Sequence, residues 1–141
     1  MSATGPEQIV RDFLAALEAG DPGTAGELLS GDVRYTNVTL PTLRGRERVM
    51  RVLGAASKRG MGFRVHYVAV AGDGGTVLTD RIDELSFGRF AQRFWVYGRF
   101  EVVDGKITVW RDAFDWFDIT VSLLRGLAGI AVPALNRSWP G

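Results

Sequence analysis

The sequence predicts an α+β fold in which helices pack on one face of a strongly curved, mixed but largely antiparallel sheet. Apolar residues recur at helical spacing in the first part of the chain and at strand spacing from Phe63 onward. Two turn sequences, at residues 72–75 and 104–105, separate long strand-like segments and indicate hairpins. Helices followed by antiparallel strands favour an α+β arrangement, and a curved sheet wrapped against helices forms a cone with an internal pocket.

The N-terminal segment predicts two helices. Apolar residues at helical spacing over residues 9–17 indicate an amphipathic helix, which Ser2 or Thr4 can cap and Gly20 ends. An Asp-Pro-Gly turn then leads into a short second helix that runs through residues 28–29.

A short strand and a third helix follow. Residues 33–38 have the pattern of a strand, and proline and glycine interrupt the chain before the next helix. That helix is expected over about residues 46–58, with Val49, Val52 and Leu53 facing inward.

The second half of the chain predicts two hairpins and a final helix. The four strands are expected at residues 63–70, 76–87, 90–103 and 106–114. A C-terminal helix is expected over residues 117–131, and residues 133–141 have the composition of a loose tail. The final helix is expected to serve as a lid or as a contact between two subunits.

Length and composition indicate one ordered domain over residues 1–141, which ends in a C-terminal helix and tail at 117–141. The hydrophobic share of 46% and the charged share of 23% are ordinary for a globular protein. A net charge of +1 gives no electrostatic basis for binding nucleic acid.

Residue counts exclude several kinds of chemistry. The chain has no cysteine, which excludes disulfides and thiolate chemistry, and its single histidine, His66, cannot form a multi-histidine metal site. We therefore expect neither a metal nor a cofactor. The N-terminus lacks a secretory signal, and the apolar tract at 119–135 is interrupted by Arg125 and Pro133, so we expect a cytoplasmic protein without membrane insertion.

Polar residues stand out within the apolar strands. Tyr35 and Asn37 are two residues apart, as are Arg81 and Asp83, and Asp112 closes the last strand. Residues i and i+2 of a strand project from the same face, so each pair points in one direction. If these faces share one pocket, its two carboxylates, guanidinium, phenol and amide can hold a water, deprotonate it and protonate a substrate oxygen.

The segments that contain these residues resemble the limonene-1,2-epoxide hydrolase family. They read Tyr35-Thr-Asn-Val-Thr-Leu-Pro, Asp80-Arg-Ile-Asp and Asp104-Gly-Lys-Ile-Thr-Val-Trp-Arg-Asp-Ala-Phe-Asp. The resemblance extends over about residues 6–118. It implies the cone-shaped NTF2-like (cystatin-like) roll of the superfamily that also contains ketosteroid isomerases and SnoaL-like polyketide cyclases, and it implies a homodimer.

The resemblance also implies a role for each polar residue. Asp112 resembles the general base that deprotonates water, and Asp83 resembles the general acid that protonates the epoxide oxygen. Arg81 resembles the cation that bridges the two acids, while Tyr35 and Asn37 resemble the groups that hold the water. The implied reaction turns an epoxide and water into a vicinal diol without a cofactor or a covalent intermediate.

Large apolar side chains on the same strand faces are expected to line the substrate pocket. These are Leu85, Phe94, Val96, Trp110 and Phe114. A pocket with such walls suits a small to medium lipophilic epoxide and excludes bulk water.

Other interpretations remain open from the sequence. Arg81 and Asp83 could form a surface ion pair of little energetic value, and Asp112 could cap a strand end. Asp115 and Asp118 are expected to be structural, at the start of the last helix. The alternative functions are an epoxide-opening cyclase, in which a substrate hydroxyl replaces water, and a non-catalytic binding domain. Proton abstraction from carbon is disfavoured, because an arginine between the aspartates would weaken a carboxylate base.

Overall fold

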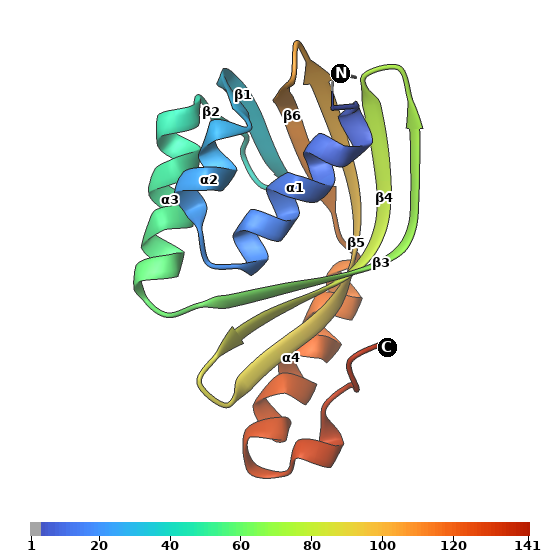
Figure 1. Cartoon of the computed structure of the whole chain (residues 1–141). Helices are drawn as coiled ribbons and strands as arrows, with labels where there is room; N and C mark the ends of the chain where they lie inside the picture. The colour runs from blue at the N-terminus through green and yellow to red at the C-terminus, as the bar shows by residue number, and fades with distance from the viewer. Residues whose placement is uncertain (1–3) are drawn as a thin grey trace.

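The computed structural model describes residues 4–141 and contains one six-stranded mixed sheet with strand order β2-β1-β6-β5-β4-β3 (Figure 1). The helices are α1 (Pro6–Glu18), α2 (Pro22–Glu27), α3 (Arg46–Lys58) and α4 (Trp116–Ala131), followed by a 3-10 turn (Pro133–Leu135). The strands are β1 (Leu29–Val38), β2 (Leu43–Arg44), β3 (Gly62–Asp73), β4 (Thr76–Phe87), β5 (Phe90–Val103) and β6 (Lys106–Ala113). Only β1 and β6 pair in parallel among these strands, so the mixed, largely antiparallel sheet expected from the sequence is confirmed.

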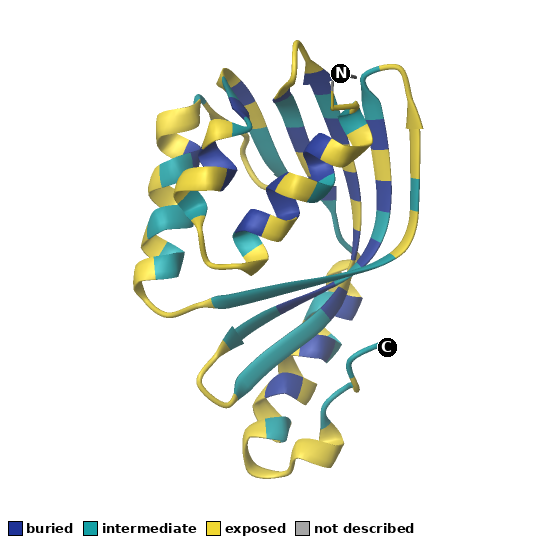
Figure 2. Cartoon of the chain, in the orientation of Figure 1, coloured by how far each residue is buried: buried dark blue, intermediate teal, exposed yellow. Residues whose placement is uncertain are grey.

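The core lies between the concave face of the sheet and α1 (Figures 1 and 2). The apolar face of α1 is buried, and the ring of its Phe13 makes edge-to-face contacts with Trp110 at 4.9 Å and with Phe100 at 6.5 Å. Buried and exposed residues alternate along β4, β5 and β6, as expected for a sheet with one covered face. The helical periodicity of the N-terminal segment therefore predicted the packing face correctly.

Several element boundaries differ from the sequence-based expectations. The N-cap of α1 is Gly5, which makes no side-chain cap, and Ser2 lies outside the described residues. The second helix ends at Glu27 because Leu29 already pairs with Ile107 in the sheet. Val52 was expected to face inward but is 48% exposed.

The tail after α4 is docked rather than loose, which corrects the expectation for residues 133–141. Asn136 Nδ2 donates a hydrogen bond of 2.9 Å to the carbonyl oxygen of Ala91. The guanidinium of Arg137 pairs with Asp118 at 2.7 Å and also donates to the carbonyl oxygen of Arg93. These contacts fasten the tail to β5 and to the first turn of α4.

Helix α4 projects from the end of the sheet beside β5 (Figure 1). Asp115 caps the helix by accepting hydrogen bonds from the N–H groups of Phe117 and Asp118, which confirms its structural role. Asp118 accepts a hydrogen bond from the Trp95 N–H, at a point of β5 beyond the end of its pairing with β6. Among the described residues, no helix combines the length and apolar character needed to cross a membrane.

Candidate active site

Four of the five polar residues selected from the sequence line a cavity between the sheet and the helices, namely Tyr35, Asn37, Asp83 and Asp112. The fifth, Arg81, does not line the cavity and is completely buried. Asn37 on β1 lies directly opposite Asp112 on β6 in the sheet register. Arg81 on β4 contacts both aspartates: it donates from Nε and Nη2 to the Asp83 carboxylate, at 3.1 and 2.9 Å, and from Nη2 to Asp112 Oδ2 at 3.3 Å. The structure therefore excludes a surface ion pair for Arg81 and Asp83.

Arg81 can reach Asp112 because the intervening strand carries a glycine. Gly98 on β5 lies between Thr79 on β4 and Asp112 on β6 in the register. A Cβ atom at Gly98 would lie 2.6 Å from Arg81 Nη1 and 2.9 Å from Asp112 Oδ1. The same guanidinium nitrogen donates a hydrogen bond of 3.1 Å to Thr79 Oγ1. Neither Thr79 nor Gly98 was predicted from the sequence as part of the site, although a glycine inside a strand is a known signal of close approach.

Burial makes this cluster electrostatically unusual. The exposed fractions of Arg81, Asp83 and Asp112 are 0%, 4% and 5%. Burial alone would lower the pKa of Arg81, but the charges of Asp112 and Asp83 raise it on balance, so the guanidinium stays charged. Burial raises the pKa of Asp83 to about 6, against the opposing effect of Arg81. Asp83 can therefore change protonation state near neutral pH.

The two oxygens of Asp112 have different surroundings. Oδ2 accepts hydrogen bonds from Trp110 Nε1 at 3.1 Å and from Arg81. Oδ1 is buried and receives no hydrogen bond from any of residues 4–141. One carboxylate oxygen is thus fixed by the protein, while the other keeps its full capacity to accept a proton or a hydrogen bond.

Tyr35 and Asn37 form a second polar pair beside Asp112. The Tyr35 hydroxyl and the Asn37 side-chain amide lie 3.0 Å apart, measured from the amide nitrogen. The Tyr35 ring stacks on Trp110 with centroids 3.8 Å apart. Burial and the nearby charge of Asp112 raise the pKa of Tyr35, so its hydroxyl remains protonated, and it donates to Asn37 Oδ1 at 3.2 Å.

The cavity has a volume of about 370 Å³ and walls that are mainly apolar. Of the five residues expected to line it, Leu85, Phe94, Trp110 and Phe114 do so. Val96 does not, because it is completely buried in the sheet behind the cavity wall. Further lining residues were not predicted from the sequence and include Leu17, Leu53, Met61, Phe63, Gln92, Trp116 and Ile119.

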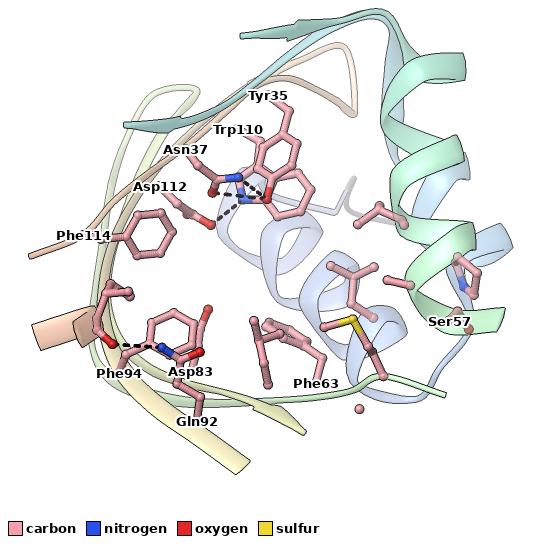
Figure 3. A pocket seen from close by; sticks show the side chains of 18 of the residues that line it. Tyr35, Asn37, Ser57, Phe63, Asp83, Gln92, Phe94, Trp110, Asp112 and Phe114 are labelled. Atoms are coloured by element: carbon pink, nitrogen blue, oxygen red, sulfur yellow. Dashed lines mark hydrogen bonds between the residues drawn. The ribbon is translucent and has the colours of Figure 1, made fainter. Parts of the chain in front are cut away.

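Figure 3 shows how the polar groups are distributed around this space. Asp112, Trp110, Tyr35 and Asn37 lie along one wall, and Asp83 lies across from them beside Phe94. A small molecule between the walls can therefore contact the carboxyl group of Asp83 on one side and that of Asp112 with the Tyr35–Asn37 pair on the other. Within residues 4–141, no three metal-ligating side chains come together as a metal site.

Comparisons with known proteins agree on one family. Residues 4–125 match the sequence model described as the limonene-1,2-epoxide hydrolase catalytic domain. The epoxide hydrolase EphG of Mycobacterium tuberculosis (strain ATCC 25618 / H37Rv) is 43% identical over 129 residues, which cover 92% of this chain and 86% of the relative.

Solved structures give the same result at the level of the fold. The structure of an M. tuberculosis LEH-like epoxide hydrolase has a TM-score of 0.90 and 39% identity, covering 97% of this chain and 100% of the other. A putative polyketide cyclase from Xanthomonas campestris pv. campestris has a TM-score of 0.73 at 16% identity, covering 84% of this chain and 96% of the other. The similarity to the polyketide cyclase concerns the fold alone and agrees with the expected NTF2-like roll.

Proposed function

This chain belongs to the limonene-1,2-epoxide hydrolase family and is an epoxide hydrolase, and we propose that it adds water to a lipophilic epoxide in one step to give a vicinal diol. The observation that carries the proposed mechanism is the buried Arg81 that contacts both Asp83 and Asp112 beside an apolar cavity. The proposal assigns different tasks to the two carboxyl groups.

Asp83 is the proposed general acid. An epoxide oxygen is a poor leaving group unless it receives a proton as the C–O bond breaks. A pKa of about 6 leaves roughly half of Asp83 protonated at pH 6 and roughly one-tenth at pH 7, far more than for an ordinary aspartate, which suits an acid catalyst. In the proposed step, the proton of Asp83 passes to the epoxide oxygen as that bond opens.

Asp112 is the proposed general base. Its carboxylate lines the cavity with Tyr35 and Asn37, so it can accept a proton from a water molecule that the Tyr35 hydroxyl and the Asn37 amide also contact. As the water oxygen bonds to the epoxide carbon, its proton passes to Asp112. The Trp110 N–H holds the carboxylate in this orientation. Each positioned proton transfer contributes roughly 10²–10⁴-fold to the rate.

Arg81 is proposed to keep the two acids in different protonation states. Its single positive charge compensates the negative charge of one buried carboxylate. The cluster of Arg81, Asp83 and Asp112 is therefore neutral when the two aspartates together hold one proton. The guanidinium has no proton to lose in this pH range, and its planar shape suits two-sided contact. At the end of the cycle Asp112 holds a proton taken from the water, and Asp83 has given its own proton to the new hydroxyl group. Loss of a proton from Asp112 and uptake of one by Asp83, by exchange with solvent, restore the resting state.

The proposed substrate is lipophilic, and the proposed assembly is a homodimer. The apolar cavity of about 370 Å³ favours a substrate with a small to medium hydrocarbon skeleton. Exposed apolar residues on the outer sheet face, including Trp95 and Tyr97, support a contact between two copies.

The proposal is tested by turnover of a panel of cyclic terpene, styrene-type, fatty-acid and sterol epoxides in heavy-oxygen water. We expect the wild type to form labelled diols and Asp112→Asn and Asp83→Asn to lose at least ~10²-fold in rate, because each lacks one proton transfer. Unlabelled cyclic ethers would instead identify a cyclase. Absence of turnover across the panel, with all three proteins folded, would support a non-catalytic binding domain.

A further inference from the structure

One polar group in the cavity has no part in the proposed reaction. Gln92 on β5 lies opposite Leu85 of β4 and lines the cavity. Its Nε2 donates hydrogen bonds of 3.1 Å to the carbonyl oxygen of Ile119 and to Ser122 Oγ, both on α4. These contacts hold the side chain against the start of the helix.

The orientation of the Gln92 amide follows from these partners. A backbone carbonyl only accepts hydrogen bonds, so the amide atom facing Ile119 must be the nitrogen. Ser122 Oγ donates its own hydrogen to the same carbonyl at 2.9 Å and therefore acts as an acceptor toward Gln92. The amide nitrogen is thereby committed to α4, and the carbonyl oxygen Oε1 is directed away from the helix.

The oxygen of Gln92 is unpaired within the part of the chain that the structure describes. Among residues 4–141, no N–H or O–H group makes a hydrogen bond to Oε1, and this atom is not among the fully buried unpaired ones. Figure 3 shows the Gln92 side chain in the cavity wall, close to Asp83 and Phe94. Leu85, opposite Gln92 in the register, offers no hydrogen-bond donor, and both carboxylate oxygens of Asp83 are engaged by Arg81.

We infer that Gln92 Oε1 accepts a hydrogen bond from a hydroxyl or N–H group of the substrate, so that the enzyme prefers lipophilic epoxides carrying such a donor. The inference rests on the proposed function and names the substrate class of the same cavity. Gln92 lies two residues before Phe94, which faces Asp83 in the register. Two residues of a strand span roughly 7 Å. The hydroxyl or N–H group of the substrate should therefore lie about that far from the epoxide ring.

The test uses two epoxides of the same shape. One is a cyclohexene oxide with a hydroxymethyl group across the ring from the epoxide, and the other carries an ethyl group at the same carbon. We expect the wild type to favour the hydroxymethyl compound in kcat/KM by roughly three- to tenfold, the effect of one neutral hydrogen bond. Gln92→Leu should remove this preference while still hydrolysing the ethyl compound.

A matched control and a second variant keep the result interpretable. Gln8→Leu makes the same change at an exposed position of α1 and should keep the preference. Gln92→Met provides a flexible replacement if Gln92→Leu does not fold, as judged by thermal unfolding. A wild type without preference, or a preference that survives in a folded Gln92 variant, would overturn the inference.

Binding separates failure of this inference from failure of the proposed function. Asp112→Asn should bind both epoxides without converting them, and calorimetry then gives the ratio of their dissociation constants. Tighter binding of the hydroxymethyl compound to Asp112→Asn supports the role of Gln92 even without turnover, provided that the double variant Asp112→Asn/Gln92→Leu binds both compounds equally. Equal binding of the two compounds overturns that role even if hydrolysis is observed.

Discussion

At the scale of single residues, the cluster depends on what surrounds each charge. Arg81 and Asp83 are of the types found in many surface ion pairs, but here the arginine is completely buried and bonds to Thr79 as well as to both aspartates. Burial of this kind costs free energy unless the partners are well placed. The arrangement is therefore sensitive to small changes in geometry and in protonation.

The pH dependence of the reaction should report the titration of Asp83. The proposed mechanism needs this carboxyl group protonated, and its pKa is raised to about 6 by burial. We expect kcat/KM to fall as pH rises above this value, by about tenfold per pH unit once most molecules have lost the proton. The apparent pKa belongs to the coupled unit of Asp83, Arg81 and Asp112. A pH–rate profile that is flat or rises between pH 6 and 8, in protein that stays folded, would contradict Asp83 as the acid.

Gly98→Ala should damage activity far more than the fold. The added Cβ would meet Arg81 Nη1 at 2.6 Å and Thr79 Oγ1 at 2.7 Å, which forces these side chains to move. Overpacking of this kind costs about 1–3 kcal/mol of stability. A displacement of about 1 Å at reacting groups costs about 10²-fold in rate. Steady-state kinetics and thermal unfolding measure the two effects.

The control for this variant is Gly31→Ala, at an exposed strand glycine where an added Cβ meets nothing within 4 Å. It should leave kcat/KM unchanged. Wild-type activity in Gly98→Ala would show that catalysis does not need Arg81 to extend over Gly98 toward Asp112.

At the scale of elements, local pattern predicted most helices and strands, and long-range pairing accounts for the differences. The helix at Arg46–Lys58 and the strand at Thr76–Phe87 match their expected bounds because their periodicity is strong. The two-residue strand β2 was not predicted, since it exists only through its pairing with Arg34 and Tyr35 of β1. The tail was expected to be loose because its partners, Ala91 and Arg93, are more than 40 residues away in sequence.

The same distinction applies to the site. The five polar residues could be selected because each breaks an apolar strand pattern, and the resemblance to a family supplied their roles. The contact of Arg81 with Asp112 over β5 could not be predicted from the sequence, because it depends on the register of three strands. Gln92 was missed for a similar reason, because the orientation of its amide depends on the groups of α4 that accept hydrogen bonds from its nitrogen.

At the scale of the whole molecule, the outer face of the sheet and α4 are two exposed apolar surfaces that can contact a second copy, and we propose the sheet face. Trp95 and Tyr97 project from β5 away from the cavity and are 51% and 56% exposed. Leu78, on the same face of β4, is 51% exposed. Isolated exposed apolar residues are ordinary, but three large ones on adjacent strands indicate a binding surface.

We therefore expect Tyr97→Arg to convert a homodimer into a monomer. Light scattering coupled to size exclusion should give about twice the chain mass of 15.4 kDa for the wild type and the single-chain mass for the variant. Arginine is chosen as the replacement because burying its unpaired charge at an interface makes the free energy of association less favourable. The control is Leu124→Arg on α4, where the side chain is 61% exposed on a separate surface. If Leu124→Arg dissociates the dimer and Tyr97→Arg does not, the contact is made by α4, and the outer sheet face needs another explanation.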